Sequence, residues 1–332
     1  ARMRMEVFAN LVFLVGWGFG LWLLYACYML PTVFIPLMVV YYLRILHSRA
    51  ELSDGAPWEA FSKGYWPFRW FREYFHLSLV LPPSRSLSER EMTAYLAADP
   101  ANAYIFACHP HGVTADYRVY MEGMMYDAFP AFKKLKREWR VLAASILFWL
   151  PLVREVVLWT GCVDAGRSTA EKQLRKGRSL LVIPGGEAEQ IKSQFGVERV
   201  HLKDRMGFVA LAVAHGASLV PVYVFGANDT YYTSNVFFGV RNLIRKHLKV
   251  CLCVFWGDVG LAPRRVKTTV VFGDPLKVEK HSRPGKAASE AEKQAFRDTV
   301  AKVHADYVSA LEELFEEKKT GLGYGDRKLI ID

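Results

Sequence analysis

The chain has 332 residues, a hydrophobic fraction of 52% and a formal net charge of +10. This length is enough for one large domain or two modest ones. A basic chain can bind nucleic acid through charge alone, but the sequence contains no nucleic-acid-binding motif, so we expect no nucleic-acid partner. The five cysteines include no C-x-x-C pair, which argues against a Cys/His zinc site and indicates reduced thiols in a cytosol-facing protein. We therefore expect no bound metal.

The hydrophobic excess is concentrated near the N-terminus. Residues 7–43 carry no charge, and this run is nearly twice the about 20 residues that one membrane-spanning helix requires. It is also too long for the apolar part of a signal peptide. Pro31 and Pro36 interrupt the run, so we expect Pro31 to end a first arm and a second arm to extend from Thr32 to about Ile45. Basic residues on both sides favour two cytosolic ends, so residues 1–50 are predicted to form a membrane-embedded helical hairpin, with a buried core hairpin as the alternative.

Residues 51–83 are expected to form an interfacial segment followed by a linker. Between Trp58 and Phe75, aromatic side chains are mixed with lysine and arginine, which is typical of an element at a membrane surface. Pro82-Pro83 marks the linker, and Ser88–Ala97 has the pattern of a short capped helix. Clusters of basic residues follow, and most of them are expected to form a solvated face. On a membrane-anchored chain such clusters can instead contact anionic headgroups or attract a phosphorylated substrate. They are Lys133, Lys134, Lys136, Arg137, Arg241, Arg245, Lys246, Lys249, Arg264, Arg265 and Lys267.

From about Asn102 the sequence alternates short apolar runs with polar helical stretches. This alternation predicts an α/β domain with a mostly parallel sheet flanked by helices, over residues 84–320. The expected strands are Tyr104–Cys108, Ser179–Ile183, Ser218–Phe225, Val250–Trp256 and Thr268–Phe272, and the expected helices are Thr169–Lys176, Gly207–His215 and Ser289–Lys318. The apolar stretch Val141–Thr160 is expected to be a buried helix pair or a membrane-embedded lip beside the site. Residues 321–332 are expected to be a flexible tail.

His109-Pro110-His111-Gly112 follows the first predicted strand of this domain. Loops at the end of a core strand often carry catalytic groups, because the sheet fixes them while leaving them accessible. Two imidazoles there supply groups that titrate near neutral pH. A helix beginning after Gly112 would bring Asp116 back toward His111, and a histidine held by a carboxylate can take a proton from a hydroxyl nucleophile. The alternative is a pair of structural histidines in an ordinary loop.

Three further segments follow in order. Gly161 to Arg167 places an arginine after a turn, Pro184-Gly185-Gly186-Glu187 ends a strand and is followed by Glu189, and Val220-Pro221-Val222 lies in another strand. The order H-x-x-x-x-D, G-x-x-x-x-x-R, P-G-G-E and V-P-V resembles that of the glycerolipid acyltransferases. H-P-H-G, P-G-G-x-x-E, R-x-G-F, G-A-x-L-V-P and H-x-x-Y-x-x-x-L-x-x-L-F-E together resemble the narrower diacylglycerol acyltransferase type 2 family, which includes monoacylglycerol and wax-alcohol acyltransferases. The resemblance covers nearly the whole chain.

The resemblance implies roles for the residues of these motifs. His111 is the expected general base, His109 is a structural neighbour or a substrate contact, and Glu189 is the family's acidic residue, with helix capping as its alternative role. Substrate is expected against Pro110, Gly112, Pro184, Gly185, Gly186 and Glu187, where glycines allow close approach of the backbone or simply form a turn. Arg167 and Arg205 are candidates for the coenzyme A phosphates, and Arg205 has a structural ion pair as its alternative role.

The sequence departs from the family pattern at Glu187, a position that is more often small or polar, and in two motifs. Tyr74-Phe75-His76 stands where the family commonly has Y-F-P, and Thr114-Ala115-Asp116 stands where it tends to have glycine and asparagine. The second of these motifs puts Asp116 in the relay position of the phospholipid-precursor enzymes. Glu187 or Glu189 is the next candidate partner for His111.

These observations predict an acyl-CoA-dependent enzyme that converts diacylglycerol to triacylglycerol. It is expected to have no cofactor apart from acyl-CoA as co-substrate. It is expected to act among membrane lipids, at the cytosolic face of the endoplasmic reticulum membrane and at lipid droplets, and a homo-oligomer is a candidate assembly. Monoacylglycerol, a long-chain alcohol or a lysophospholipid is the alternative acceptor. A lipase is disfavoured because the sequence lacks a G-x-S-x-G motif. A non-catalytic lipid-droplet protein would leave the histidines and the P-G-G-E loop unexplained.

Overall fold

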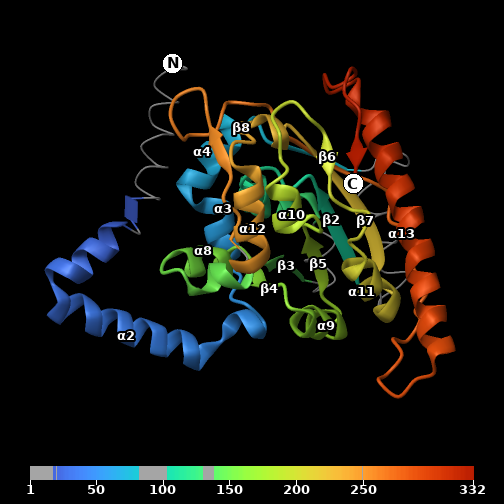
Figure 1. Ribbon diagram of the computed structural model, residues 1–332, viewed down its shortest axis with the longest axis horizontal. Helices are drawn as coiled ribbons and strands as arrows, with labels where there is room; N and C mark the ends of the chain where they lie inside the picture. The colour runs from blue at the N-terminus through green and yellow to red at the C-terminus, as the bar shows by residue number, and fades with distance from the viewer. Residues whose placement is uncertain (1–17, 20, 82–102, 130–137, 249) are drawn as a thin grey trace.

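The computed structural model describes residues 18–19, 21–81, 103–129, 138–248 and 250–332 (Figure 1). A seven-stranded sheet lies at its centre, in the order β1-β10-β7-β2-β5-β3-β4. These strands are β1 (Ser78–Val80), β2 (Tyr104–His109), β3 (Trp139–Ala143), β4 (Cys162–Asp164), β5 (Ser179–Val182), β7 (Ser218–Phe225) and β10 (Thr269–Phe272). All neighbouring strands are parallel except β10 and β7. The predicted α/β class with a mostly parallel sheet is confirmed.

Helices cover both faces of this sheet. One face packs against α3 (Glu59–Gly64), α4 (Trp66–Tyr74), α6 (Asp116–Ala128) and α8 (Val153–Trp159). The other packs against α9 (Arg167–Arg175), α11 (Gly207–His215) and α13 (Glu290–Lys319). The central strand β2 is buried on both sides: Phe106 and Cys108 belong to the first core, and Ile105 and Ala107 to the second. A strand covered on both faces is apolar throughout, which is why β2 could be identified in the sequence.

The N-terminal part has the predicted helix break at Pro31 but not the one predicted at Pro36. Residues 21–29 are helical, Leu30 is not, and α2 (Pro31–Ser48) begins with Pro31 in its first turn. Pro36 lies inside α2 without ending it, because one missing backbone hydrogen bond leaves the turns on both sides intact. Among the described residues, Pro31–Leu52 is the one helical stretch long and apolar enough to span a membrane, and little of it is buried. Much of the predicted first arm lies outside the described residues, as do Pro82-Pro83 and Ser88–Ala97.

The aromatic segment from Trp58 to Phe75 contributes several of its rings to the core. Phe68, Phe71 and Phe75 are buried, whereas Trp58 and Trp66 remain exposed. Phe71 and Phe75 stack against Tyr120 of α6. Mixed aromatic and basic residues therefore reflect two faces of α3 and α4, one packed on the domain and one exposed.

Two other expectations differ from the structure. Val141–Thr160 is not a helix pair: it contains most of β3, then the 3-10 helix η2 (Ser145–Trp149) and α8. A strand there escaped detection because β3 carries the buried Arg140, whose guanidinium donates to the backbone oxygen of Asp54. The strand predicted at Val250–Trp256 is limited to β9 (Val254–Trp256), which pairs with β8 (Tyr232–Ser234) outside the main sheet.

The C-terminal residues also differ from the prediction of a flexible tail. β11 (Ile330–Ile331) pairs in parallel with β6 (Arg199–Val200). The backbone oxygen of Asp332 accepts hydrogen bonds from the backbone N–H groups of Leu202 and Lys203, at 2.8 and 3.1 Å. These contacts join the C-terminal residues to the segment that follows α10 (Gly186–Gln190), the short helix after β5.

Candidate active site

The H-P-H-G motif spans the carboxyl end of β2 and the loop that follows. β2 lies beside β5, and the P-G-G-E motif leads from the end of β5 into α10. Because neighbouring parallel strands end at the same edge of a sheet, the two motifs meet there although they are about 75 residues apart in sequence. This edge is the candidate site, and its geometry follows from hydrogen bonds between the two loops.

Glu189 joins α10 to the H-P-H-G loop. Its carboxylate accepts a hydrogen bond from the backbone N–H of His111 and another, at 2.7 Å, from the backbone N–H of His201. Next to it, the side-chain amide of Gln190 donates to the backbone oxygen of Val113 at 2.6 Å. Burial raises the pKa of Glu189 to about 7, and the two backbone donors oppose that rise. Glu189 thus contacts the backbone of His111 rather than its imidazole ring.

The ring of His111 has a defined tautomer. Its Nδ1 lies 3.0 Å from the backbone oxygen of Gly112. A carbonyl oxygen can only accept, so Nδ1 carries the proton and Nε2 holds a lone pair. Burial lowers the pKa of His111 below its ordinary value of 6.5, which keeps the ring neutral at physiological pH. A neutral imidazole with a free Nε2 lone pair is the form that a general base requires.

His109 has a different environment, although it is only two residues away. It is fully buried at the end of β2, and its Nε2 lies 3.1 Å from the hydroxyl of Tyr307 on α13. That hydroxyl donates to the backbone oxygen of Ala107 at 3.1 Å, so His109 Nε2 must be the donor to it. Burial lowers the pKa of His109 to about 3. His109 therefore stays neutral and ties the loop to α13.

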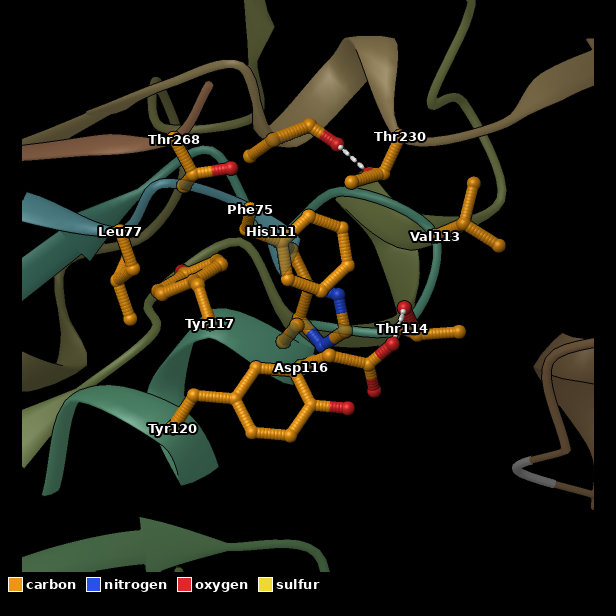
Figure 2. A pocket seen from close by; sticks show the side chains of 12 residues that line it. Phe75, Leu77, His111, Val113, Thr114, Asp116, Tyr117, Tyr120, Thr230 and Thr268 are labelled. Carbon is orange, nitrogen blue, oxygen red and sulfur yellow. Dashed lines mark hydrogen bonds between the residues drawn. The ribbon is translucent and has the colours of Figure 1, made fainter. Parts of the chain in front are cut away.

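A pocket opens at His111 (Figure 2). Its lining is mostly apolar or aromatic, with a few hydroxyl groups, and comes from the H-P-H-G loop, α6, the end of α4 and the segments before β8 and β10. The lining residues are Phe75, Leu77, His111, Val113, Thr114, Ala115, Asp116, Tyr117, Tyr120, Ala227, Thr230 and Thr268. Such a lining suits a lipid chain ending in a hydroxyl or ester group.

Asp116 is the first residue of α6 and shares this pocket with His111 (Figure 2). Its carboxylate accepts a hydrogen bond from the Thr114 hydroxyl at 2.8 Å. Burial raises the pKa of Asp116 to about 6, and the Thr114 hydrogen bond partly offsets the rise. The hydrogen bond of the His111 ring goes to Gly112, so Asp116 faces the same space as His111 without orienting it directly.

The remaining residues of the two motifs support the loops. Pro110 accepts a hydrogen bond from the Tyr117 hydroxyl through its backbone oxygen, at 3.0 Å. Gly112 has φ +65°, a left-handed conformation, and a Cβ there would lie 3.0 Å from the backbone oxygen of Ala227. At Gly185 a Cβ would overlap the Glu189 side chain. Glycine is therefore required at these two positions by the backbone and by Glu189.

Pro184, Gly186 and Glu187 are partly exposed and do not belong to the pocket lining. Gly186 begins α10 and adopts φ +50°, with open space where a Cβ would lie. The backbone oxygen of Glu187 receives the Cys251 thiol at 3.8 Å. These residues shape the turn into α10 beside the pocket.

The two candidate arginines lie apart from the pocket. Arg205 donates to the backbone oxygen of Gly185 at 3.0 Å, so it holds the P-G-G-E loop in place. Arg167 begins α9 and pairs with Glu171 one turn later, at 2.7 Å, with its side chain largely exposed. Neither guanidinium is among the residues that line the pocket.

Sequence reasoning missed several residues of this site. Tyr307 lay within a recognised motif, but nothing in its spacing indicated contact with His109. Gln190 adjoins Glu189 and could have been identified only from the pairing of the two loops. Tyr117 and Tyr120 occur one turn apart after Asp116, and this spacing is a signal that they share a face of α6. In the part of the chain that the structure describes, no group of three or more His, Cys, Asp or Glu side chains is placed to hold a metal ion.

Comparison with known proteins places this chain in a family. The family model described as "Diacylglycerol acyltransferase" matches residues 27–332. The chain belongs to the diacylglycerol acyltransferase family.

It is 31% identical to acyl-CoA wax alcohol acyltransferase 2 of Mus musculus over 251 residues, which cover 70% of each chain. It is 30% identical to diacylglycerol O-acyltransferase 2 of Xenopus tropicalis over 289 residues, covering 79% of this chain and 70% of the relative. It is also 30% identical to 2-acylglycerol O-acyltransferase 3 of Homo sapiens over 275 residues, covering 77% and 72%.

The recognition made from the motifs is therefore confirmed at the level of the family. The protein is a member of an acyltransferase family of lipid metabolism. Its relatives are named for three different acceptors, so family membership sets the reaction class and leaves the acceptor open.

Proposed function

We propose that this protein transfers an acyl group from acyl-CoA to the free hydroxyl of diacylglycerol, giving triacylglycerol, with no cofactor besides the acyl-CoA co-substrate. The observation that carries the proposal is the His111 ring. Its Nδ1 proton goes to Gly112, and its Nε2 lone pair is left as the acceptor beside a largely apolar pocket. Membership of the diacylglycerol acyltransferase family supports acyl transfer as the reaction class.

The mechanism follows from this tautomer. The acceptor hydroxyl gives its proton to His111 Nε2 while its oxygen attacks the thioester carbonyl carbon of acyl-CoA. The tetrahedral intermediate then collapses, the carbon–sulfur bond breaks, and the coenzyme A sulfur leaves with the proton that His111 returns. No acyl-enzyme forms, so an acyl-protein adduct or ping-pong kinetics would contradict the scheme.

Glu189 and His109 are positioning residues in this scheme. Glu189 fixes the backbone N–H of His111, and His109 fixes the strand end that carries it. Asp116, whose pKa is about 6, is mostly ionised at neutral pH and favours the imidazolium that forms when His111 takes the proton.

The pocket lining favours a lipid acceptor. Phe75, Leu77 and Tyr120 offer apolar surface to an acyl chain, whereas Thr230 and Thr268 are suited to hydrogen bonding with ester or hydroxyl oxygens. We further propose that the protein works at the cytosolic face of the endoplasmic reticulum membrane and at lipid droplets, with α2 embedded among lipids. Deleting residues 2–44 is then expected to reduce membrane retention, and full retention by the shortened chain would contradict the role of α2.

The function is tested by product analysis in membranes of a host that lacks neutral-lipid synthesis. One labelled acyl-CoA is supplied with diacylglycerol, monoacylglycerol, a long-chain alcohol or a lysophospholipid in separate reactions, for the wild type and His111→Ala. Labelled triacylglycerol that disappears in the variant is the expected result. Product from a different acceptor alone would refute diacylglycerol as the substrate, and no product from any acceptor with folded wild-type protein would refute acyl transfer.

A further inference from the structure

α12 (Phe238–Leu248) has an inverted distribution of side chains. A helix on a globular domain normally buries its apolar side chains and exposes its charged ones. In α12 the one buried side chain is Arg241, whereas Val240, Leu243 and Leu248 are 59%, 57% and 68% exposed. The apolar side of this helix therefore faces away from the domain.

Arg241 holds the helix in this orientation. Its guanidinium donates to three backbone oxygens, those of Ser234 at 2.9 Å, Val236 at 2.8 Å and Leu252 at 3.0 Å. These contacts close the segments before and after α12 onto its inner side. A buried arginine that satisfies three carbonyl oxygens replaces the apolar packing that would otherwise attach the helix.

The flanking segments carry further exposed apolar side chains. Phe237, immediately before the helix, is 76% exposed and adopts φ +51°, a conformation rarely seen for bulky residues. The other exposed apolar residues of residues 236–261 are Val236, Val250, Leu252, Trp256, Val259 and Leu261. A contiguous sequence segment with this many exposed apolar side chains marks an interaction surface.

The charge of the segment indicates which partner it meets. Residues 230–257 contain no aspartate or glutamate, and α12 carries Arg245 and Lys246 next to its exposed apolar residues. Apolar side chains bordered by cations, without acidic residues, match an anionic lipid surface, where acyl chains receive the former and headgroups the latter.

The position of the segment fits the same partner. The Cys251 and Cys253 thiols donate to the backbone oxygens of Glu187 and Gln190, at 3.8 and 3.5 Å, so the chain after α12 lies on the helix that holds the His111 loop. A membrane in contact with α12 would thus border the site from which a lipid substrate enters.

We propose that residues 236–261 form a second membrane-contacting surface, in which α12 lies in the plane of an anionic lipid interface with Phe237, Val240 and Leu243 inserted among the acyl chains. The proposal goes beyond the proposed function, because contact with lipid can be measured without any acyl transfer. A negative result for lipid contact therefore does not contradict the proposed acyl transfer, and a negative result for acyl transfer does not contradict lipid contact.

The test is photolabelling of the full chain in vesicles of phosphatidylcholine and phosphatidylserine that contain a lipid with a diazirine on its acyl chain. After irradiation and digestion, mass spectrometry gives the label on each peptide. Peptides from residues 236–248 are expected to be labelled to a degree comparable with α2 and well above α13. Labelling no higher than that of α13 overturns the proposal.

Two variants separate the apolar and the charged contributions. Val240→Ser with Leu243→Ser is expected to lower labelling of this segment toward the α13 level while α2 labelling is unchanged, and Met206→Ser, at an exposed site by α11, is the matched control. Arg245→Glu with Lys246→Glu is expected to lower labelling by about fivefold or more for each cation removed. This decrease is expected only in vesicles that contain phosphatidylserine, and Lys302→Glu on α13 is the control. Unchanged labelling in both variants would contradict the proposal.

Discussion

The two histidines of the H-P-H-G motif lie in different regions of the molecule. His109 belongs to the core between the sheet and α13, where it contacts Tyr307, and His111 belongs to the pocket at the edge of the sheet. Both rings are neutral, but only His111 has a lone pair facing space that a substrate can occupy. Two histidines only two positions apart therefore have different environments, and we propose that His109 supports the fold while His111 reacts.

The largest expected effect comes from removing the reacting group. His111→Ala should lower kcat about 10²–10⁴-fold, since a positioned general base typically contributes that much. The measurement is the initial rate of ester formation at saturating acyl-CoA. A loss below about tenfold would mean that another group accepts the proton and that the comparison between the two histidines is mistaken.

The link between the two loops should have the next largest effect. Glu189→Ala removes the acceptor of the His111 and His201 backbone N–H groups, which costs about 1.5–3 kcal/mol for hydrogen bonds to a charged group, or roughly 10–100-fold in kcat if the cost falls on loop positioning. Glu189→Gln keeps an acceptor oxygen and should retain much more activity. Equal inactivity of the two variants would show that the carboxylate takes part in proton transfer instead.

Loss of the contact between His109 and Tyr307 should lower the stability of the protein rather than its catalytic rate. Tyr307→Phe removes the hydroxyl that contacts His109 and Ala107, and leaves buried polar groups unsatisfied at a cost of about 1–3 kcal/mol. Thermal unfolding in detergent should show a lower Tm, with kcat of the folded protein close to that of the wild type. A large fall in kcat at unchanged Tm would place His109 and Tyr307 in the reaction itself.

The smallest effect concerns pH. In the proposed mechanism the base form of His111 acts, and burial lowers its pKa, so the acid limb of the pH–rate profile should be centred below pH 6.5. Asp116 loses its charge as the pH falls through its pKa of about 6. Asp116→Asn should therefore alter the acid limb of the pH–rate profile and leave the plateau flat. An acid limb centred above pH 6.5 in both proteins would contradict the buried, neutral His111.

Much of the fold was predictable because its signals are local. β2 and β7 are apolar on both faces, and α13 has regular apolar spacing, so their patterns were legible in the sequence. β3 was not, because its charged Arg140 is paired by residues far away in the chain. The last residues were assigned as a tail for the same reason, since their strand partner, β6, lies more than a hundred residues earlier.

The candidate site was also predictable only in part. The motifs located His111 and Glu189 at one edge of the sheet, but not the contact between them, which runs through a backbone N–H group and has no residue-type signature. Nor did the pattern distinguish the roles of His109 and His111, because burial is decided by α13, about 200 residues away. Asp116 was expected beside His111 and shares its pocket, whereas the hydrogen bond of the ring to Gly112 depends on backbone geometry.

The most direct test makes the same substitution at both histidines. His109→Gln and His111→Gln are compared by kcat and by Tm under one set of conditions. The account predicts that His111→Gln loses about 10²–10⁴-fold in kcat with little change in Tm, and that His109→Gln lowers Tm while the folded protein keeps most of its kcat. Comparable losses of kcat at both positions without loss of stability would contradict the division of roles on which the account rests.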